Sequence, residues 1–193
     1  MKKVYIVLED GHVFEGERFG AEGEVTGEFV FTTGMGAYVE TLTDPTYYGQ
    51  IVMHTFPLIG NYGIMEEDFE SDKSYIKAYV VREWCDAPSN FRCEYTIDEY
   101  LKKQGIVGVC GVDTREITRV IRDNGVMNAK IVDDPSTVDF DELKAYKITD
   151  AVATVSTKEA YTVESEAHSK KVAVVDFGKT KATVAELTKR GCD

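Results

Sequence analysis

The sequence lacks any apolar run that approaches the roughly 20 residues a helix needs to cross a bilayer. The short apolar stretch after Lys2 and Lys3 is interrupted by Glu9 and Asp10, so it indicates a first strand rather than a signal peptide. Positive charge is also scarce, because 22 lysines and arginines face 34 aspartates and glutamates and give a net charge of −12. Such a surface repels phosphate backbones and anionic lipids. We therefore expect neither nucleic acid nor a membrane among its partners.

Cysteine and histidine are too few and too scattered to indicate a metal site. The residues concerned are Cys85, Cys93, Cys110, Cys192, His12, His54 and His168. No two of the cysteines have the short spacing of a zinc-binding pair. We predict no metal, and four free thiols in the reducing cytoplasm, where we expect the protein to reside.

Apolar and aromatic residues are plentiful enough to build a core. Hydrophobic side chains make up 43% of the 193 residues and aromatic ones 11%, which argues against wholesale disorder. A chain of this length suits one domain, or one domain and part of another.

The first half of the sequence predicts mainly strands. Asp10 and Gly11 separate two strand-like runs and form a strong hairpin signal, because glycine accepts the positive φ of a tight turn. The other elements expected there are a strand at 27–34, a helix at 37–44 ended by Pro45, a strand from residue 50 and a strand at 75–84.

Two helices in the second half carry clear start signals. Thr96 and Glu99 form a capping box, in which the hydroxyl and the carboxylate satisfy free backbone amides, and Gly105 ends that helix. Asp113 and Glu116 repeat the device. The remaining elements expected are a buried strand at 106–112, a strand at 126–132 and a helix around 140–146. This alternation indicates a mixed sheet with helices packed on it, complete by about residue 148.

The last part of the sequence has a different character. Residues 149–170 are polar without an apolar period, so we interpret them as a surface linker. Residues 171–193 predict an apolar strand, a turn at Gly178 and an amphipathic helix stopped by Gly191. One strand and one helix cannot cover their own apolar faces. The apolar faces of this unit must pack against residues 1–148 or against polypeptide beyond it.

Two turns contain residues that suit ligand binding. Gly34 and Gly36 precede a helix and could hold an anion on free amides, although a tight strand-to-helix turn explains them as well. Thr46 follows Asp44 and Pro45, so its hydroxyl is either exposed to a ligand or bonded to its own backbone.

Charged and titratable residues elsewhere leave two interpretations each. His54 suits a general base, but a histidine within an apolar strand is more often buried and hydrogen-bonded. Arg115, Arg119 and Arg122 recur at helical spacing, which indicates either a solvated face or a contact for an acidic partner. The acidic residues within 66–72 lack the pattern of a calcium loop and indicate a solvated loop.

Seven longer segments match one known family in order along the chain. They are FTTGMGAYVETLTDPTYYGQIV, PLIGNYG, EDFES, APSN, GVDTREITRVIRDNGVMNAKI, VSTKEAY and VAVVDFGKTK. Together they resemble the small subunit of glutamine-hydrolysing carbamoyl-phosphate synthase, over nearly the whole chain. Seven segments in the same order are far more specific than any one of them.

The resemblance implies an α/β fold in two parts. Residues 1–148 would form the family's N-terminal domain, of swivelling β/β/α type with a mixed sheet, and residues 149–170 the linker. Residues 171–193 would be the first βα unit of a class I glutamine amidotransferase domain. The chain would then be a small subunit truncated just inside that domain.

The resemblance also implies an activity for the complete subunit. In the family, the small subunit hydrolyses glutamine to glutamate and ammonia and forms a heterodimer with a large subunit. The large subunit binds the nucleotide, and uses ATP, magnesium and bicarbonate to make carbamoyl phosphate for pyrimidines and arginine. We therefore expect a large-subunit partner, glutamine as the substrate, and no cofactor in this chain itself.

The resemblance assigns one binding residue and no catalytic one. The family's N-terminal domain contacts glutamine through a serine in an Asp-Pro-Ser-Tyr turn, and Thr46 occupies that position here. The family's catalytic cysteine, histidine and glutamate would lie further along, and Cys192 matches none of them. We expect this chain alone to be catalytically inactive.

A function of another class stays open at the level of the residues. The chain could be a free-standing swivelling phosphocarrier or binding module that uses His54 as the acceptor. A phosphocarrier histidine must be exposed and close to amides that hold phosphate. Exposure of His54 beside Gly34 and Gly36 would favour this alternative, and burial would exclude it.

Overall fold

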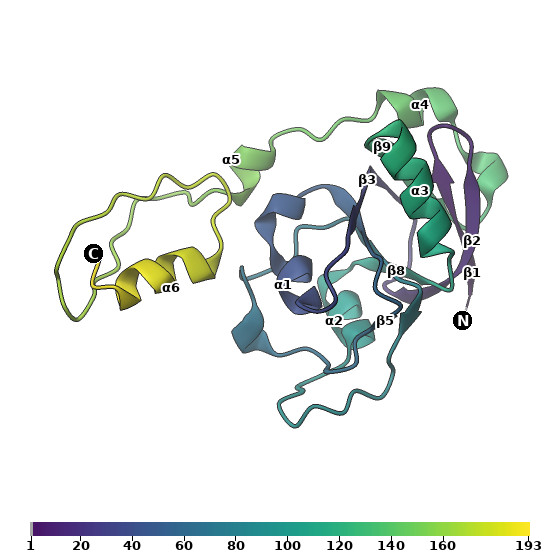
Figure 1. The fold of residues 1–193 in the computed structure, drawn as a ribbon. Helices are drawn as coiled ribbons and strands as arrows, with labels where there is room; N and C mark the ends of the chain where they lie inside the picture. Colours follow the sequence, from purple (N-terminus) through teal and green to yellow (C-terminus); the bar gives the residue numbers. More distant parts are fainter. Residues whose placement is uncertain (1) are drawn as a thin grey trace.

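Seven strands of the computed structural model close into one barrel (Figure 1). The structure describes residues 2–193. The barrel strands are β1 (Lys3–Leu8), β2 (Val13–Gly20), β3 (Val25–Thr32), β4 (Gln50–His54), β6 (Ala78–Val80), β8 (Val107–Cys110) and β9 (Met127–Val132). Their order around the barrel is β1-β2-β8-β6-β4-β3-β9, and β9 then pairs with β1.

The barrel mixes parallel and antiparallel pairs. Strands β3, β4, β6 and β8 are neighbours in parallel pairs, whereas every pair that includes β1, β2 or β9 is antiparallel. The predicted mixed sheet is therefore confirmed, but its closure was not predicted. Closure requires β9 to pair on both edges, with β3 on one side and with β1 on the other, where Tyr5 lies opposite Val132.

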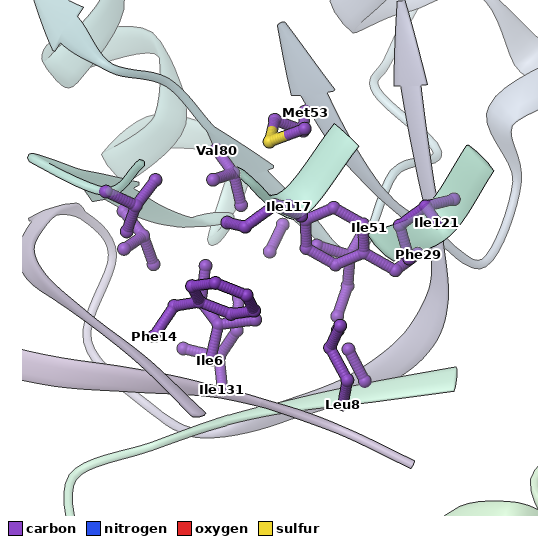
Figure 2. Close-up of a cluster of buried hydrophobic side chains, with 14 of the residues drawn as sticks. Ile6, Leu8, Phe14, Phe29, Ile51, Met53, Val80, Ile117, Ile121 and Ile131 are labelled. Carbon is purple, nitrogen blue, oxygen red and sulfur yellow. The ribbon is translucent and has the colours of Figure 1, made fainter. Parts of the chain in front are cut away.

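Alternate side chains of the barrel strands point inward and fill the interior (Figure 2). On β1, Ile6 and Leu8 belong to this interior cluster, whereas Val7 packs in a separate cluster on the outside. Helix α3 (Thr114–Asn124) adds Ile117 and Ile121 to the interior cluster. The two-residue period of the strands thus separates a dry interior from an outer face that helices can cover.

Three further helices cover the outside of the barrel. They are α1 (Tyr38–Thr43), α2 (Ile97–Gln104) and α4 (Phe140–Ala145). Leu42 of α1 and Tyr100 of α2 pack in one cluster with the outward-facing Tyr79 of β6. Leu143 of α4 packs with Val7 in another. No helix within residues 2–193 has both the length and the apolar composition needed to cross a membrane.

The capping signals are confirmed in one helix and half confirmed in the other. The Thr96 hydroxyl accepts the Glu99 amide at 3.2 Å, and the Glu99 carboxylate accepts the Thr96 amide at 2.7 Å. Gly105 follows with a φ of 70°, as a left-handed cap requires. At α3, Asp113 accepts the Glu116 amide at 3.0 Å. The hydrogen bonds of the described residues include no return bond from Glu116, so this is a simple N-cap.

The predicted strand at 75–84 is two separate strands. Only Ala78–Val80 pairs within the barrel, as β6. The chain then leaves the barrel, and β7 (Glu83–Trp84) pairs in parallel with β5 (Leu58–Ile59). The break falls where the Arg82 carbonyl accepts the Gly111 amide at 2.9 Å. Three 3-10 helices complete the connections: η1 (Pro45–Tyr47), η2 (Glu66–Asp68) and η3 (Pro135–Thr137).

The strand predicted at the start of 171–193 is wrong. Residues 171–177 form no strand, and the amides of 173–177 have no hydrogen-bond partner among the described residues. Only an isolated bridge joins Lys170 to Cys192. A strand needs a neighbouring backbone edge, and the barrel offers none because it is closed. Phe177 is accordingly 69% exposed.

The rest of the last segment agrees better with expectation. The predicted final helix is α6 (Lys181–Lys189), and Gly178 and Gly191 adopt positive φ on either side of it. The predicted linker is mostly irregular and exposed, but it contains the short helix α5 (Ala151–Val155). Figure 1 shows α6 beside the barrel, on the side away from α3.

Replacing a barrel-interior side chain should cost much of the stability. Phe29 is fully buried, so Phe29→Ala should lower the free energy of unfolding by about 3–5 kcal/mol through lost burial and a cavity. Phe91 is 96% exposed, and Phe91→Ala should change it by no more than about 0.5 kcal/mol. Urea unfolding of both variants measures the difference. Equal effects would contradict the assignment of Phe29 to the core.

Candidate functional site

The turn between α1 and β4 holds Thr46 on the surface. The Asp44 carboxylate accepts the Thr46 amide at 2.8 Å and the Thr46 hydroxyl at 2.7 Å. Since the hydroxyl donates its only proton to Asp44, its remaining lone pairs can only accept. Thr46 can therefore bind an N–H donor of a ligand. The Thr46 hydroxyl thus bonds to the Asp44 side chain and not to its own backbone. The sequence analysis did not predict this role of Asp44, although an Asp-Pro-Thr turn is a signal for such a bond.

This turn lies where the last segment meets the barrel. A Cβ atom on Gly178 would lie 2.8 Å from Val155 and 3.9 Å from Pro45. Gly178 has a φ of 110°, so both its backbone and its surroundings favour glycine. We call this contact, formed by residues 43–46, 70–72 and 176–182, the junction.

Polar contacts hold the other side of the junction. The Lys181 amide donates to the Glu70 carbonyl at 2.8 Å, and the Lys181 ammonium lies 2.7 Å from the Asp72 carboxylate. The Glu70 amide in turn donates to the Thr43 hydroxyl at 2.9 Å. The end of α1 is thereby connected to the start of α6 through one loop. Asp72 is largely exposed, so its ion pair stabilises the junction little.

Asp176 shapes the turn that faces this loop. One carboxylate oxygen accepts the amides of Gly178 and Lys179, each at 2.8 Å, and the other accepts the Thr157 amide at 2.9 Å. Partial burial opposes ionisation of Asp176, but these amide bonds outweigh it and lower the pKa of the carboxyl. The ionised side chain thus ties α5's end to the Gly178 turn.

A second turn of the same chemistry lies elsewhere. Asp134 accepts the Ser136 amide at 2.9 Å and the Ser136 hydroxyl at 2.7 Å, as Asp44 does for Thr46. This turn, η3, packs against β1. Local sequence cannot separate the two turns. Only their tertiary placement puts Thr46, and not Ser136, at the junction.

His54 is buried in the barrel wall. Its Nε2 lies 3.0 Å from the Gly34 carbonyl and its Nδ1 lies 2.8 Å from the Tyr79 hydroxyl. The carbonyl can only accept, so Nε2 carries the proton and Nδ1 accepts from Tyr79. Burial lowers the pKa of His54 and keeps the ring neutral. The phosphocarrier alternative is therefore wrong, and the structural interpretation of His54 is confirmed.

Gly34 and Gly36 form a turn rather than an anion site. The Gly34 amide, which an anion would need, already donates to the Thr32 hydroxyl at 3.4 Å. The helix that follows, α1, is six residues long and begins after Ala37, which has a φ of 58°. The interpretation as a tight strand-to-helix turn is confirmed.

The acidic segment at 66–72 is a loop with local ion pairs. Arg92 lies 2.6 Å from the Glu67 carboxylate, and the Tyr95 hydroxyl donates to Glu66 at 2.8 Å. No group of three or more histidines, cysteines and acids within residues 2–193 is placed to hold a metal ion.

No thiol in residues 2–193 is hydrogen-bonded to a histidine. Cys93 contacts the Tyr95 carbonyl and Cys110 the Glu17 carbonyl. Burial raises the pKa of Cys110 to about 11, so this thiol stays protonated near neutral pH. A nucleophilic cysteine needs a nearby base, and the thiol hydrogen bonds within residues 2–193 go only to backbone carbonyls.

The arginine stripe lies on an open groove. Arg115, Arg119 and Arg122 of α3 line a surface cavity of about 780 Å³ together with Arg82. Sequence reasoning identified the three helical arginines, but not Arg82, which is distant along the chain.

Comparison with known proteins identifies a family. The family description "Carbamoyl-phosphate synthase small chain, CPSase domain" matches residues 6–131, which run from β1 to β9 and so cover the barrel. A carbamoyl phosphate synthase small chain of Clostridium perfringens is 48% identical over 99% of this chain and 55% of that protein. Those of Bacillus thuringiensis, at 47%, and Streptococcus agalactiae, at 45%, match over 52% and 54% of their lengths. The chain spans about half the length of these curated relatives.

The neutral state of His54 predicts how stability depends on pH. The pKa of His54 is lowered in the folded protein, so its contribution is fully present above the unfolded pKa of about 6.5 and is lost as pH falls toward the folded pKa. The free energy of unfolding should fall between pH 7.5 and 5.5, and His54→Gln should flatten this dependence. Urea unfolding across this range measures the slopes, and an unchanged slope in His54→Gln would refute the prediction.

Proposed function

This chain belongs to the carbamoyl-phosphate synthase small-chain family, and on that premise we propose that it is part of a small subunit that supplies ammonia from glutamine. The complete subunit hydrolyses glutamine to glutamate and ammonia. A large-subunit partner then uses the ammonia with ATP, magnesium and bicarbonate to make carbamoyl phosphate, for pyrimidine and arginine synthesis. The observation that carries this proposal is the family match over the whole barrel, together with relatives named as small chains over 99% of the sequence.

The proposed division of the chain follows burial. Residues 1–148 form the N-terminal domain, residues 149–170 the linker, and residues 171–193 the start of a glutamine amidotransferase domain. Two observations support it: Ile148 still packs on the barrel, about 3 Å from where a Gly49 Cβ would lie, and beyond it only Ser165 and Gly191 are buried.

We assign Thr46 to glutamine binding. Its hydroxyl donates to Asp44 and is left as an acceptor, which suits the ammonium or amide N–H groups of glutamine. Its place at the junction supports the assignment, since a residue there can contact a substrate held by the second domain. Threonine keeps the hydroxyl of the family's serine and adds a methyl group.

Catalysis itself belongs to other residues of the complete subunit. A cysteine thiolate needs a base and an oxyanion hole to form and resolve a thioester. We therefore propose that residues 1–193 position substrate and partner but do not hydrolyse glutamine. Four free cysteines fit the reducing cytoplasm as the site of this reaction.

Removing the Thr46 hydroxyl should weaken glutamine use selectively. In the complete subunit bound to its large subunit, Thr46→Ala should raise the KM for glutamine about 2- to 10-fold, as expected for one lost hydrogen bond of about 0.5–1.5 kcal/mol. Synthesis driven by ammonium salts should not change, because ammonia bypasses the glutamine site. Steady-state kinetics with the two nitrogen sources measures both.

Ser136→Ala is the matched control, because it removes a hydroxyl from a turn of the same geometry. It should leave the KM for glutamine unchanged, and Thr46→Ser should retain most of the wild-type affinity. If Thr46→Ala impaired the glutamine and ammonia reactions equally, Thr46 would be structural and the assignment wrong.

A further inference from the structure

The arginine groove lies at one defined rim of the barrel. Strands β3, β4, β6 and β8 are parallel, so their carboxyl ends meet at the same rim. Thr33 follows β3, Thr55 follows β4, Arg82 follows β6 and Asp113 follows β8, and all four line the groove with α3.

The positive charge in the groove is largely unneutralised. Arg115, Arg119 and Arg122 are spaced four and three residues apart, so they share one face of α3, where like charges repel. Arg122 lies 3.0 Å from Asp123, and no ion pair among residues 2–193 includes Arg115, Arg119 or Arg82. Such a concentration of positive charge on a protein of net charge −12 favours a negatively charged partner.

The geometry favours several carboxylates over a single phosphate. The three helical arginines are spread along about 10 Å of α3, at 1.5 Å per residue, and all three are exposed. Asp113 already occupies the position at the N-terminus of α3 where an anion would bind, and accepts the Glu116 amide at 3.0 Å. A phosphate at that position would be repelled by this carboxylate, whereas acidic side chains spread along a protein surface can pair with the arginines one by one.

The groove also faces away from the junction. The turn that holds Thr46 leads into the amino end of β4, whereas the groove lies at the carboxyl ends. Figure 1 accordingly shows α6 and α3 on different sides of the barrel. A partner in the groove would therefore dock at the rim opposite the turn that holds Thr46.

We propose that this groove is the surface through which the chain docks on an acidic surface of its large-subunit partner. The identity of that partner rests on the proposed function. Arginine suits such contacts because its planar guanidinium binds carboxylates in a bidentate manner. Exposed charge pairs of this kind speed association and make it sensitive to salt.

The test measures binding of the complete small subunit to the large subunit at low and at physiological salt. The triple variant Arg115→Gln/Arg119→Gln/Arg122→Gln should weaken binding by about 5- to 100-fold and reduce its dependence on salt, as expected for three partly exposed charge pairs. Glutamine and arginine have similar helix propensities, so α3 should persist, which circular dichroism checks. Arg82→Gln, outside the helix, should also weaken binding.

The control variant Lys102→Gln/Lys103→Gln/Lys144→Gln also removes three positive charges, but from α2 and α4 instead of α3. It should change the affinity for the large subunit by less than about twofold. Failure of the wild-type subunit to bind the large subunit would refute the proposed function. Wild-type binding with unchanged affinity in both the triple variant and Arg82→Gln would overturn the groove assignment alone. Binding of inorganic phosphate that the triple variant loses, with no loss of large-subunit affinity, would overturn it in favour of a small anion.

Discussion

Strand β9 pairs with β1 on one edge and with β3 on the other. It closes the sheet, so that inward-facing residues such as Ile6, Phe29 and Ile131 share one dry interior. A closed sheet has no free edge, and this explains why residues 171–177 cannot extend it. It also gives the barrel two distinct rims, because its four parallel strands all point the same way.

The two roles that we propose for the domain lie at different rims. The connection from α1 enters β4 at the amino-end rim, and there Pro45, which precedes Thr46, lies close to Gly178. The connections after β3, β4 and β6 leave at the other rim, where they border the arginine groove. His54, the last residue of β4, is neutral and hydrogen-bonded through both ring nitrogens, to Gly34 and to Tyr79. We thus propose that the domain presents one surface to a substrate-bearing unit and another to an acidic partner.

Local features could be predicted from the sequence, and long-range ones could not. The hairpin at Gly11, the capping box of Thr96 and the left-handed Gly105 follow from chemistry within a few residues, and all are present. Closure of the barrel depends on the pairing of β1 with β9, which are more than 100 residues apart in the sequence. No pattern within a few residues predicts such a pairing. The apolar run in 171–177 is a sound strand signal, but a strand forms only beside a partner edge. Thr46 and Ser136 have the same local turn chemistry, and only the tertiary structure distinguishes them.

The sheet of the barrel is complete without residues 171–177, which pair with none of its strands. Native-state hydrogen exchange of the 193-residue chain tests this most directly, because exchange rates report the free energy of opening at each amide. The amides of β3 and β4 should exchange only through global unfolding, whereas those of 173–177, which lack hydrogen-bond partners, should exchange nearly as fast as in an unstructured peptide. If the amides of 173–177 were protected as strongly as those of β4, this segment would be part of a stable sheet, contrary to the structure.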